Sequence, residues 1–453
     1  MSTTITNYDG GITTTPQQHV HPKSVAELQE ILRDRQKYPS PVRAMGSNHS
    51  LTPCAASTGT VVSMDGFTKI VKIDTAKKTL TAQAGLQLVD AAAALRKKDL
   101  QFMLNIEIGN ITLGSAACCQ TKDALDGVEL GQVNSYVTAI KWVSPSGELM
   151  EASESKNPDL LPYIRGSYGL AGIVYEVTFK LKPLEIISFS YDVHDVEDLK
   201  DSTIKKAISE NQSIVLWTIG DDIVIQSRNK AKKLKHEFLA DAREFGWNFL
   251  AAYTGRGIRD RLGASGLGKV KQNLGSGVEL AFYRLLSAGG GFTLNPPDKT
   301  VDYSKTKRSA RYAFTFWAFP RAAFVKNLQD YVKWADAYYE QHGFRCNMPL
   351  GSYFIHKDRS SLLSYTWDGD IISLDPIHAP GEKEQQAWAD FLKAFNEWAH
   401  ERGGIPLLNQ SPFVRKEHVI SAYGDRWTQL ADWLKTVDPN RRMVNEFFGE
   451  LLP

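Results

Sequence analysis

The sequence is poor in cysteine. Its four residues of this type are Cys54, Cys118, Cys119 and Cys346. They follow neither a Cys-x-x-Cys spacing nor a pattern of partnering histidines. We therefore expect no structural zinc site and no disulfide framework, and we predict that the protein holds no metal.

Long apolar runs are also missing. A membrane-spanning helix needs about 18 or more consecutive apolar residues, and the most apolar loop, residues 278–294, is interrupted by Glu279 and Arg284. The N-terminus lacks the basic and apolar regions of a signal peptide. We therefore expect a soluble, cytoplasmic protein without stable membrane insertion.

The chain also lacks a strong net charge of either sign. The chain carries 53 Lys and Arg against 51 Asp and Glu, a formal net charge of +2. A nearly neutral chain has no strong positive electrostatic potential to attract the phosphates of nucleic acid, so we predict that nucleic acid is not a partner. The basic run at residues 228–235 (RNKAKKLK) is interpreted as a solvated helix face.

The first part of the chain mixes short strands with short helices. A chain of 453 residues is expected to form two domains. Within residues 15–183, Ser24 is placed to cap a helix, and residues 71–85 and 137–153 have the alternation of hairpins. This pattern predicts an α+β domain.

The pattern of apolar and polar residues changes after Pro183. Longer alternating strands are interleaved with two amphipathic helices, expected within residues 322–343 and 384–401. Strands and helices in this proportion favour a large antiparallel sheet flanked by helices. Residues 228–308 are interpreted as an insertion that forms a lid or a surface excursion.

Three glycine-rich loops punctuate the first domain, at residues 44–50, 109–117 and 166–172. Small residues let the backbone approach a ligand closely, and converging N–H groups can bind a pyrophosphate. Neither a P-loop nor a dinucleotide fingerprint is present. Ordinary turns remain the alternative. His49, inside the first loop (AMGSNHSLTP), is open to three roles: part of a phosphate-binding loop, metal ligand or covalent attachment point.

The order and spacing of these loops resemble a known family. RAMGSNHS, GNITLGSAA and RGSYGLAGIVYEVTFKLKP are similar to the flavin domain of the vanillyl-alcohol-oxidase-type FAD-linked oxidases, nearest the aldonolactone and alditol oxidase branch. The ending from Tyr423 resembles the family's closing segment. The resemblance implies a split FAD-binding domain, residues 1–183 with 413–453 returning to it, and a substrate domain at 184–412.

The resemblance also implies the cofactor and its contacts. FAD is expected to be attached covalently through His49, or else held non-covalently beside it. Phe102 stands where one branch has a second, cysteine tether, so a single bond is expected. The remaining cofactor-binding residues implied are Ala44, Met45, Gly46, Ser47, Asn48, Ser50, Gly109, Asn110, Thr112, Gly114, Ser115, Ala116, Cys118, Gly169, Gly172, Ile173 and Val174.

Several positions depart from the branch it resembles. Leu407 and Gln410 stand where lactone and alditol oxidases carry a histidine and a lysine, and Phe316 and Ala318 lie near the place of an acidic and basic pair. Residues 118–123 also differ from the usual turn. These differences disfavour polyols and lactones as substrates. The catalytic candidates are Gln410, Asn409, Tyr353 and His356; strand alternation lets only one of the last two point inward.

The function implied is oxidation of an alcohol-type CH–OH substrate by hydride transfer to flavin, with reoxidation by O2 to give hydrogen peroxide. Small-molecule substrate and O2 are the expected partners. Three alternatives stay open. They are oxidation of a CH–NH or natural-product bond, a flavin-binding protein that has lost oxidation chemistry, and a nicotinamide-dependent reductase of the same flavin fold.

Overall fold

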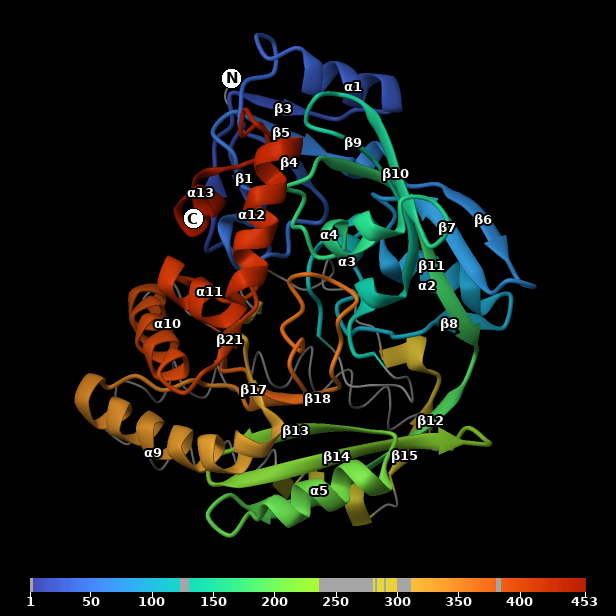
Figure 1. Cartoon of the computed structure of the whole chain (residues 1–453). Coiled ribbons are helices and arrows are strands. Elements are labelled where there is room, and N and C mark those ends of the chain that lie inside the picture. The colour runs from blue at the N-terminus through green and yellow to red at the C-terminus, as the bar shows by residue number, and fades with distance from the viewer. Residues whose placement is uncertain are drawn as a thin grey trace.

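The computed structural model describes residues 3–122, 130–235, 280–281, 283–288, 291–299, 311–379 and 384–453. The N-terminal and C-terminal parts of the chain lie together at one end of the molecule, and a long sheet lies at the other (Figure 1). Among the described residues, no helix has the length and apolar character to cross a membrane, and no cluster of side chains in these ranges is suited to a metal ion.

A small parallel sheet begins the fold. Its strands β3 (Gln18–Val20), β5 (Thr60–Ser63) and β4 (Val42–Met45) follow that order. Helix α1 (Val25–Arg33) starts where Ser24 accepts a hydrogen bond from the Glu27 N–H, and it buries Leu28, Ile31 and Leu32. The helix forms here because a capping serine precedes apolar residues at helical spacing. A two-stranded ribbon of β1 (Ile5–Thr6) and β2 (Thr13–Thr14) precedes this sheet.

An antiparallel sheet completes the first half of the molecule, in the order β10-β9-β11-β7-β6 with β8 also paired to β11. Its strands are β6 (Ile70–Asp74), β7 (Thr79–Gln83), β8 (Leu100–Phe102), β9 (Val137–Val143), β10 (Leu149–Ser153) and β11 (Ile173–Pro183). Helices α2 (Leu88–Arg96), α3 (Leu113–Cys118) and α4 (Leu161–Ile164) lie between them in sequence. Both predicted hairpins are confirmed.

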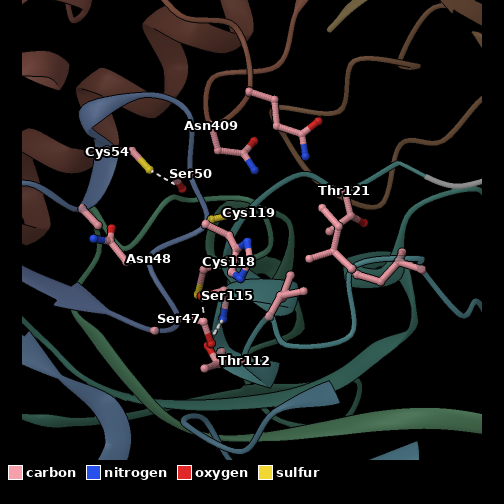
Figure 2. A pocket seen from close by; sticks show the side chains of 18 of the residues that line it. Ser47, Asn48, Ser50, Cys54, Thr112, Ser115, Cys118, Cys119, Thr121 and Asn409 are labelled. Atoms are coloured by element: carbon pink, nitrogen blue, oxygen red, sulfur yellow. Dashed lines mark hydrogen bonds between the residues drawn. The ribbon is translucent and has the colours of Figure 1, made fainter. Parts of the chain in front are cut away.

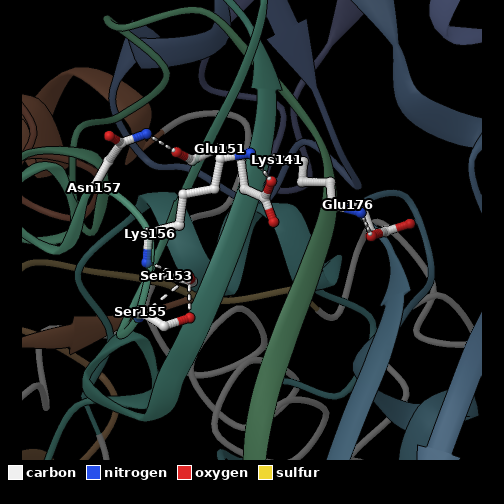
Figure 3. A network of polar contacts seen from close by, with 7 residues as sticks. All are labelled: Lys141, Glu151, Ser153, Ser155, Lys156, Asn157 and Glu176. Atoms are coloured by element: carbon white, nitrogen blue, oxygen red, sulfur yellow. Dashed lines mark hydrogen bonds and ion pairs between the residues drawn. The ribbon is translucent and has the colours of Figure 1, made fainter.

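Polar pairs follow the register of this second sheet. Lys141 on β9 lies opposite Glu176 on β11 and forms an ion pair with it at 2.7 Å (Figure 3). Lys156, in the loop after β10, bonds Glu151 at 2.7 Å. Opposite charges on facing residues favour one strand register, but exposed pairs of this kind stabilise by about 1 kcal/mol or less.

The second half is built on an eight-stranded antiparallel sheet, in the order β15-β12-β14-β13-β18-β19-β17-β21. The strands are β12 (Ile186–Asp195), β13 (Ser213–Ile219), β14 (Asp222–Ala231), β15 (Phe292–Leu294), β17 (Trp317–Pro320), β18 (Leu350–Ile355), β19 (Ile371–Leu374) and β21 (Ile405–Pro406). A separate pair joins β16 (Ala313–Phe314) to β20 (Ile377–His378). The fold class predicted from the sequence is confirmed.

Helices cover one face of this sheet. They are α5 (Asp201–Glu210), α9 (Phe324–His342) and α10 (Gln385–His400). Figure 1 shows α5 and α9 beneath the sheet. Side chains alternate between the faces: Leu216 packs with the helices, and its neighbour Trp217 belongs to the apolar cluster on the opposite face. That opposite face is turned toward the first half of the molecule.

The C-terminal segment packs against the first strands and helix of the chain. It comprises α11 (Lys416–Tyr423), α12 (Asp425–Val437) and α13 (Glu446–Leu451). The Arg442 guanidinium donates to the carbonyls of Ile31 (2.7 Å) and Leu32 (3.3 Å). The Arg442 carbonyl accepts from the Val42 N–H at 2.8 Å. Contacts of this kind agree with a returning segment, although the domain boundaries stay a prediction.

The interpretation of residues 228–235 as a helix face is wrong. Arg228 to Ala231 continue β14, and the Arg228 side chain is only 1% exposed. A run of basic residues suggests a solvated surface, but the first residues of this run extend an apolar strand whose alternation turns Arg228 inward. The expected lid at 228–308 lies mostly outside the described residues, and within it β15 joins the large sheet.

Candidate functional site

A large cavity lies between the loops of the first half and the open face of the long sheet. Figure 2 shows part of its lining. It contains about 1960 Å³ of atom-free space, part of it open to solvent. One wall is made of small residues from the first and second glycine loops, and the opposite wall is aromatic and aliphatic. Residues of that opposite wall include Trp217, Leu294, Tyr312, Phe314, Tyr353 and Ile377.

The first two glycine loops touch at Gly46. A Cβ atom added to Gly46 would lie 2.4 Å from Thr112 Oγ1 and 2.7 Å from Ser115 Oγ. Thr112 in turn caps α3, since its hydroxyl accepts from the Ser115 N–H. Figure 2 shows Ser47, Thr112 and Ser115 together at this wall. Glycine is required because any side chain would push the loops apart and widen the cavity wall.

The third loop supplies backbone that only glycine adopts easily. Gly169 has φ +72 and Gly172 has φ +131, and a Cβ atom on Gly172 would lie 2.1 Å from the Val143 carbonyl oxygen. The buried Arg43 side chain ties this loop down. It donates to the carbonyls of Tyr168, Cys54 (2.9 Å) and Met443 (2.8 Å). One guanidinium therefore joins the first loop, the third loop and the C-terminal segment.

His49 is held by two neighbours. Its Nε2 lies 2.6 Å from Asn110 Nδ2, which comes from the second loop. The Tyr8 ring stacks on its imidazole with centroids 4.4 Å apart, and the Arg311 guanidinium lies 4.5 Å from the Tyr8 ring. A stacked and hydrogen-bonded imidazole keeps one orientation, which is what a ring bound to a ligand at a fixed atom needs.

Two amide side chains close the cavity on the side of the C-terminal half. Asn409 donates to the Gln120 carbonyl at 3.3 Å, and its backbone carbonyl accepts from the Leu51 N–H at 2.9 Å. Asn409 Oδ1 and Gln410 Oε1 are buried and have no hydrogen-bond partner in the described part of the chain. Buried acceptors left unpaired are costly, so these two oxygens suit donors on a ligand.

Lys122 lines the same cavity and forms an ion pair with a buried carboxylate that is not itself part of the lining. The Lys122 ammonium bonds the Asp375 carboxylate, with side chains 11% and 0% exposed. The ammonium lies 4.4 Å from the Phe314 ring and 5.1 Å from the Tyr353 ring. Burial raises the pKa of Asp375 to about 6, against the lowering effect of Lys122.

Most of the predicted contacts come together in this cavity. The predicted residues that line it are Ala44, Gly46, Ser47, Asn48, His49, Ser50, Thr112, Gly114, Ser115, Cys118, Gly169, Gly172, Val174, Tyr353, Asn409 and Gln410. Asn110 lines a second pocket that shares His49 and Ser47. Met45, Gly109, Ala116 and Ile173 are not in the lining; Ala116 and Ile173 are core residues with no exposed surface.

His356 is not brought to the cavity. It follows β18 on the side of Phe354, whose ring lies 4.8 Å away, and it pairs with Asp370 at 3.3 Å. Tyr353 lies on the opposite side of the strand and lines the cavity. The alternation argument therefore selects Tyr353, and the structure gives His356 no contact with the other candidates.

Two cysteines near the site carry weakly acidic thiols. Burial raises the pKa of Cys118 to about 12 and that of Cys119 above its usual range. A thiol with so high a pKa stays protonated and is a poor nucleophile. Phe102, at the position matched to a second tether, packs edge-on against Phe179 in the core at 5.6 Å.

Sequence reasoning missed the charged pair and two of the aromatic groups. Lys122 lies within residues 118–123, the segment that differs from the usual turn, but no motif marks the lysine itself, and its partner Asp375 lies far along the chain. Phe314 and Tyr312 lie in a short aromatic stretch, RYAFTFWAF, in which the resemblance points only to Phe316 and Ala318. The density of aromatic residues in that stretch was the available signal.

Residues 16–153 match the family model described as an FAD binding domain. This chain therefore carries an FAD-binding domain over residues 16–153. The matched range contains the first two loops, His49 and the strands that support them. The close contact of the first two loops at Gly46, here called the cofactor cradle, and the buried acceptors at Asn409 and Gln410 are features that such a cofactor fits.

Curated relatives of this FAD-binding protein are lactone-oxidising enzymes. It is 28% identical to L-gulonolactone oxidase of Bos taurus over 42% of this chain and 44% of the relative. It is 28% identical to L-galactono-1,4-lactone dehydrogenase 1, mitochondrial, of Oryza sativa over 46% of this chain and 35% of the relative. The chain thus spans less than half the length of the first relatives. L-gulono-1,4-lactone dehydrogenase of Mycobacterium tuberculosis is 27% identical over the full length of both chains.

Solved structures with the same architecture include cholesterol oxidases. That from B. sterolicum superposes with a TM-score of 0.77 at 16% identity, covering 100% of this chain and 97% of the other. A solvent-stable cholesterol oxidase gives 0.74 at 15% identity, covering 100% and 98%. At such identities the likeness of the FAD-binding protein to these enzymes is one of fold.

Proposed function

We propose that this protein is an FAD-dependent oxidoreductase that oxidises a CH–OH group, with its flavin bound covalently through His49 and reoxidised by O2 to give hydrogen peroxide. The observation that carries the proposal is the position of His49. It stands in the wall of one cavity that the small-residue loops line on one side and aromatic side chains line on the other.

The loops are suited to hold a long, partly anionic cofactor. Gly46 and Gly169 expose backbone to the cavity, where N–H groups can meet phosphate oxygens. The buried oxygens of Asn409 and Gln410 remain acceptors for a donor on the substrate. Bound FAD supplies a two-electron acceptor for the hydride of a substrate carbon.

Covalent attachment is proposed between an imidazole nitrogen of His49 and the C8-methyl carbon of the flavin. Stacking on Tyr8 and the bond to Asn110 fix the imidazole plane. A tether of this kind prevents loss of the cofactor. It also makes the flavin a stronger oxidant, and hydride transfer is thereby favoured.

The substrate proposed is an alcohol with an apolar body. The names of the relatives point to aldonolactones, which carry several hydroxyls that need hydrogen-bond partners. The substrate wall here presents mainly Trp217, Phe314, Tyr353 and Ile377. Burying hydroxyls against such side chains is costly, whereas burying apolar surface is favourable.

Three side chains are proposed to contact this substrate. Asn409 and Gln410 would accept or donate hydrogen bonds at its polar end, and Tyr353 would pack against its body. All three line the same cavity as His49. The flavin-binding part is proposed to be residues 1–183 with 413–453, and the substrate part 184–412; the bonds of Arg43 and Arg442 to both ends of the chain support that division.

Two measurements test the proposal. Purified protein should be yellow, and acid precipitation should leave the colour and the FAD mass increment on the polypeptide. Under anaerobic conditions the flavin should be bleached by benzyl alcohol or 1-hexanol faster than by xylitol or L-gulono-1,4-lactone, and air should restore it with peroxide formation. Yellow protein without the mass increment would refute the covalent bond. A flavin bleached by amines and by none of the alcohols would refute the CH–OH assignment, and efficient turnover of xylitol or the lactone would refute the apolar substrate.

A further inference from the structure

Lys122 lines the cavity, and its partner Asp375 is fully buried next to the lining, on an element of the other half of the molecule. Lys122 follows α3 of the FAD-binding part, and Asp375 follows β19 of the long sheet. Asp375 is fixed by two backbone hydrogen bonds with Gly351, of 2.9 and 3.1 Å. The pair thus bridges the two halves of the molecule at the aromatic wall, beside Phe314 and Tyr353.

A buried ion pair contributes little net stability to the contact between two segments. Desolvation of both charges offsets most of their attraction, and apolar residues of the same size often stabilise as well or better. Outside the cavity the chain has a comparable pair, Lys182–Glu185, with side chains 9% and 18% exposed at 2.8 Å. What distinguishes Lys122 is that it lines the space that also holds Asn409 and Gln410.

We propose that the Lys122–Asp375 pair is catalytic: Lys122 contacts the reacting hydroxyl of the substrate, and the pair accepts its proton. This inference rests on the proposed oxidation of a CH–OH group. It assigns to residue 122 the cation that Gln410 does not provide. It also makes the favoured substrate one with a single oxygen at the pair and an apolar body against Trp217 and Phe314.

The proton and electron balance is complete. The hydroxyl proton passes to Lys122 as Lys122 gives one of its own to the Asp375 carboxylate, so the pair ends as ammonium and carboxylic acid. The C–H bond breaks with its electron pair going to the flavin acceptor of the proposed function, and a C=O bond forms. No further reactant is needed for this half of the reaction.

The surroundings of Asp375 suit a proton acceptor. Burial raises its pKa to about 6, so its carboxylate takes a proton more readily than an exposed one while staying ionised near neutral pH. In the described part of the chain, Lys122 is the charged side chain that acts on it, and the titratable Tyr353 ring lies 5.1 Å from the ammonium. Protonation of Asp375 at low pH removes the acceptor, so the rate should fall as pH drops through about 6.

The test uses the full-length holoprotein with Lys122→Met, Asp375→Asn and the double variant, which removes both charges and so leaves none unpaired if a single variant fails to fold. Lys182→Met is the matched control. Flavin content and thermal unfolding are measured first for every variant. Anaerobic flavin reduction by benzyl alcohol and 1-hexanol is then followed from pH 5 to 9. Benzoate binding, followed by the change in flavin absorbance, gives a readout without turnover.

Lys122→Met should slow flavin reduction by about 100-fold or more, as expected for loss of acid–base catalysis. It should weaken benzoate binding by about 10-fold or more, because a charge-assisted hydrogen bond is lost. Asp375→Asn should remove the fall in rate near pH 6, and Lys182→Met should change neither quantity.

If the wild-type flavin is bleached and the folded Lys122 and Asp375 variants match its rate, pH profile and benzoate affinity, the pair has no such role and the proposed function stands. If no alcohol bleaches the wild-type flavin, the proposed function fails and the inference falls with it.

Discussion

The close contact at Gly46 gives a quantitative prediction about the cofactor cradle. In Gly46→Ala the new methyl carbon would start 2.4 Å from Thr112 Oγ1, about 1 Å inside ordinary contact, with Ser115 Oγ at 2.7 Å. Both hydroxyls must move. Forcing one extra carbon into a packed site costs about 1–3 kcal/mol, and displacing the Thr112 cap adds up to about 1 kcal/mol more. We therefore expect a loss of about 2–3 kcal/mol in the free energy of unfolding, together with lower flavin occupancy.

Gly369→Ala is the matched control, because a Cβ atom there meets nothing within 4 Å and its φ is an ordinary one. It should leave stability within about 0.5 kcal/mol of the wild type. Urea unfolding followed by tryptophan fluorescence gives both values, and the ratio of flavin to protein absorbance gives occupancy. Adding Thr112→Ala to Gly46→Ala should recover part of the loss, because the two sites are in contact and their effects are not additive. Equal stability and occupancy in Gly46→Ala and Gly369→Ala would refute the close approach of the two loops.

Three further predictions concern other parts of the molecule. His49→Ala should release its FAD on acid precipitation and should be reduced more slowly; retained covalent flavin would place the attachment elsewhere. Because the folded pKa of Asp375 is raised to about 6, the native state binds its proton more tightly than the unfolded chain, so this group's contribution to stability is greatest at low pH and is lost as pH rises through about 6. Asp375→Asn should therefore remove a decline in unfolding free energy between about pH 4 and 6, and an unchanged pH dependence would contradict the assignment. Arg442→Met should destabilise the protein by about 2–4 kcal/mol by leaving the Ile31 and Leu32 carbonyls unpaired. Arg441→Met at the preceding position, where the side chain is exposed, should be near neutral in the same urea titration.

The parts of the site that the sequence predicted are those governed by local rules. Gly46, Gly114 and Gly172 mark places where backbone approaches another segment closely, and glycine at such places is visible in the sequence itself. The helices at 324–342 and 385–400 were likewise predictable, because their apolar residues recur at helical spacing. The hairpins followed from period-two alternation with turn residues between the strands.

The parts that escaped prediction depend on contacts between distant segments. The strand carrying Tyr353 and His356 could be recognised, but which side chain faces the cavity depends on the side of the sheet that the helices cover. Phe354 packs with those helices, so its side of the strand, including His356, is turned from the cavity. Arg228 shows the same limit, because its burial depends on the neighbours of β14 and not on the basic run in which it occurs.

Position 410 shows how a contact between distant segments can change the expected chemistry. A motif compares each residue with the residue at the same position in the family, and by that comparison Gln410 leaves the proposed substrate site without a cation. A cavity between two halves of a chain can receive its charge from any element on its walls. Here the ammonium of Lys122 enters from the loop after α3 and is held by a carboxylate 253 residues away in sequence. The charge in the part of the cavity proposed to bind substrate therefore depends on the whole assembled cavity. The apolar residues Leu407 and Phe316 alter the shape and polarity of that part without leaving it uncharged.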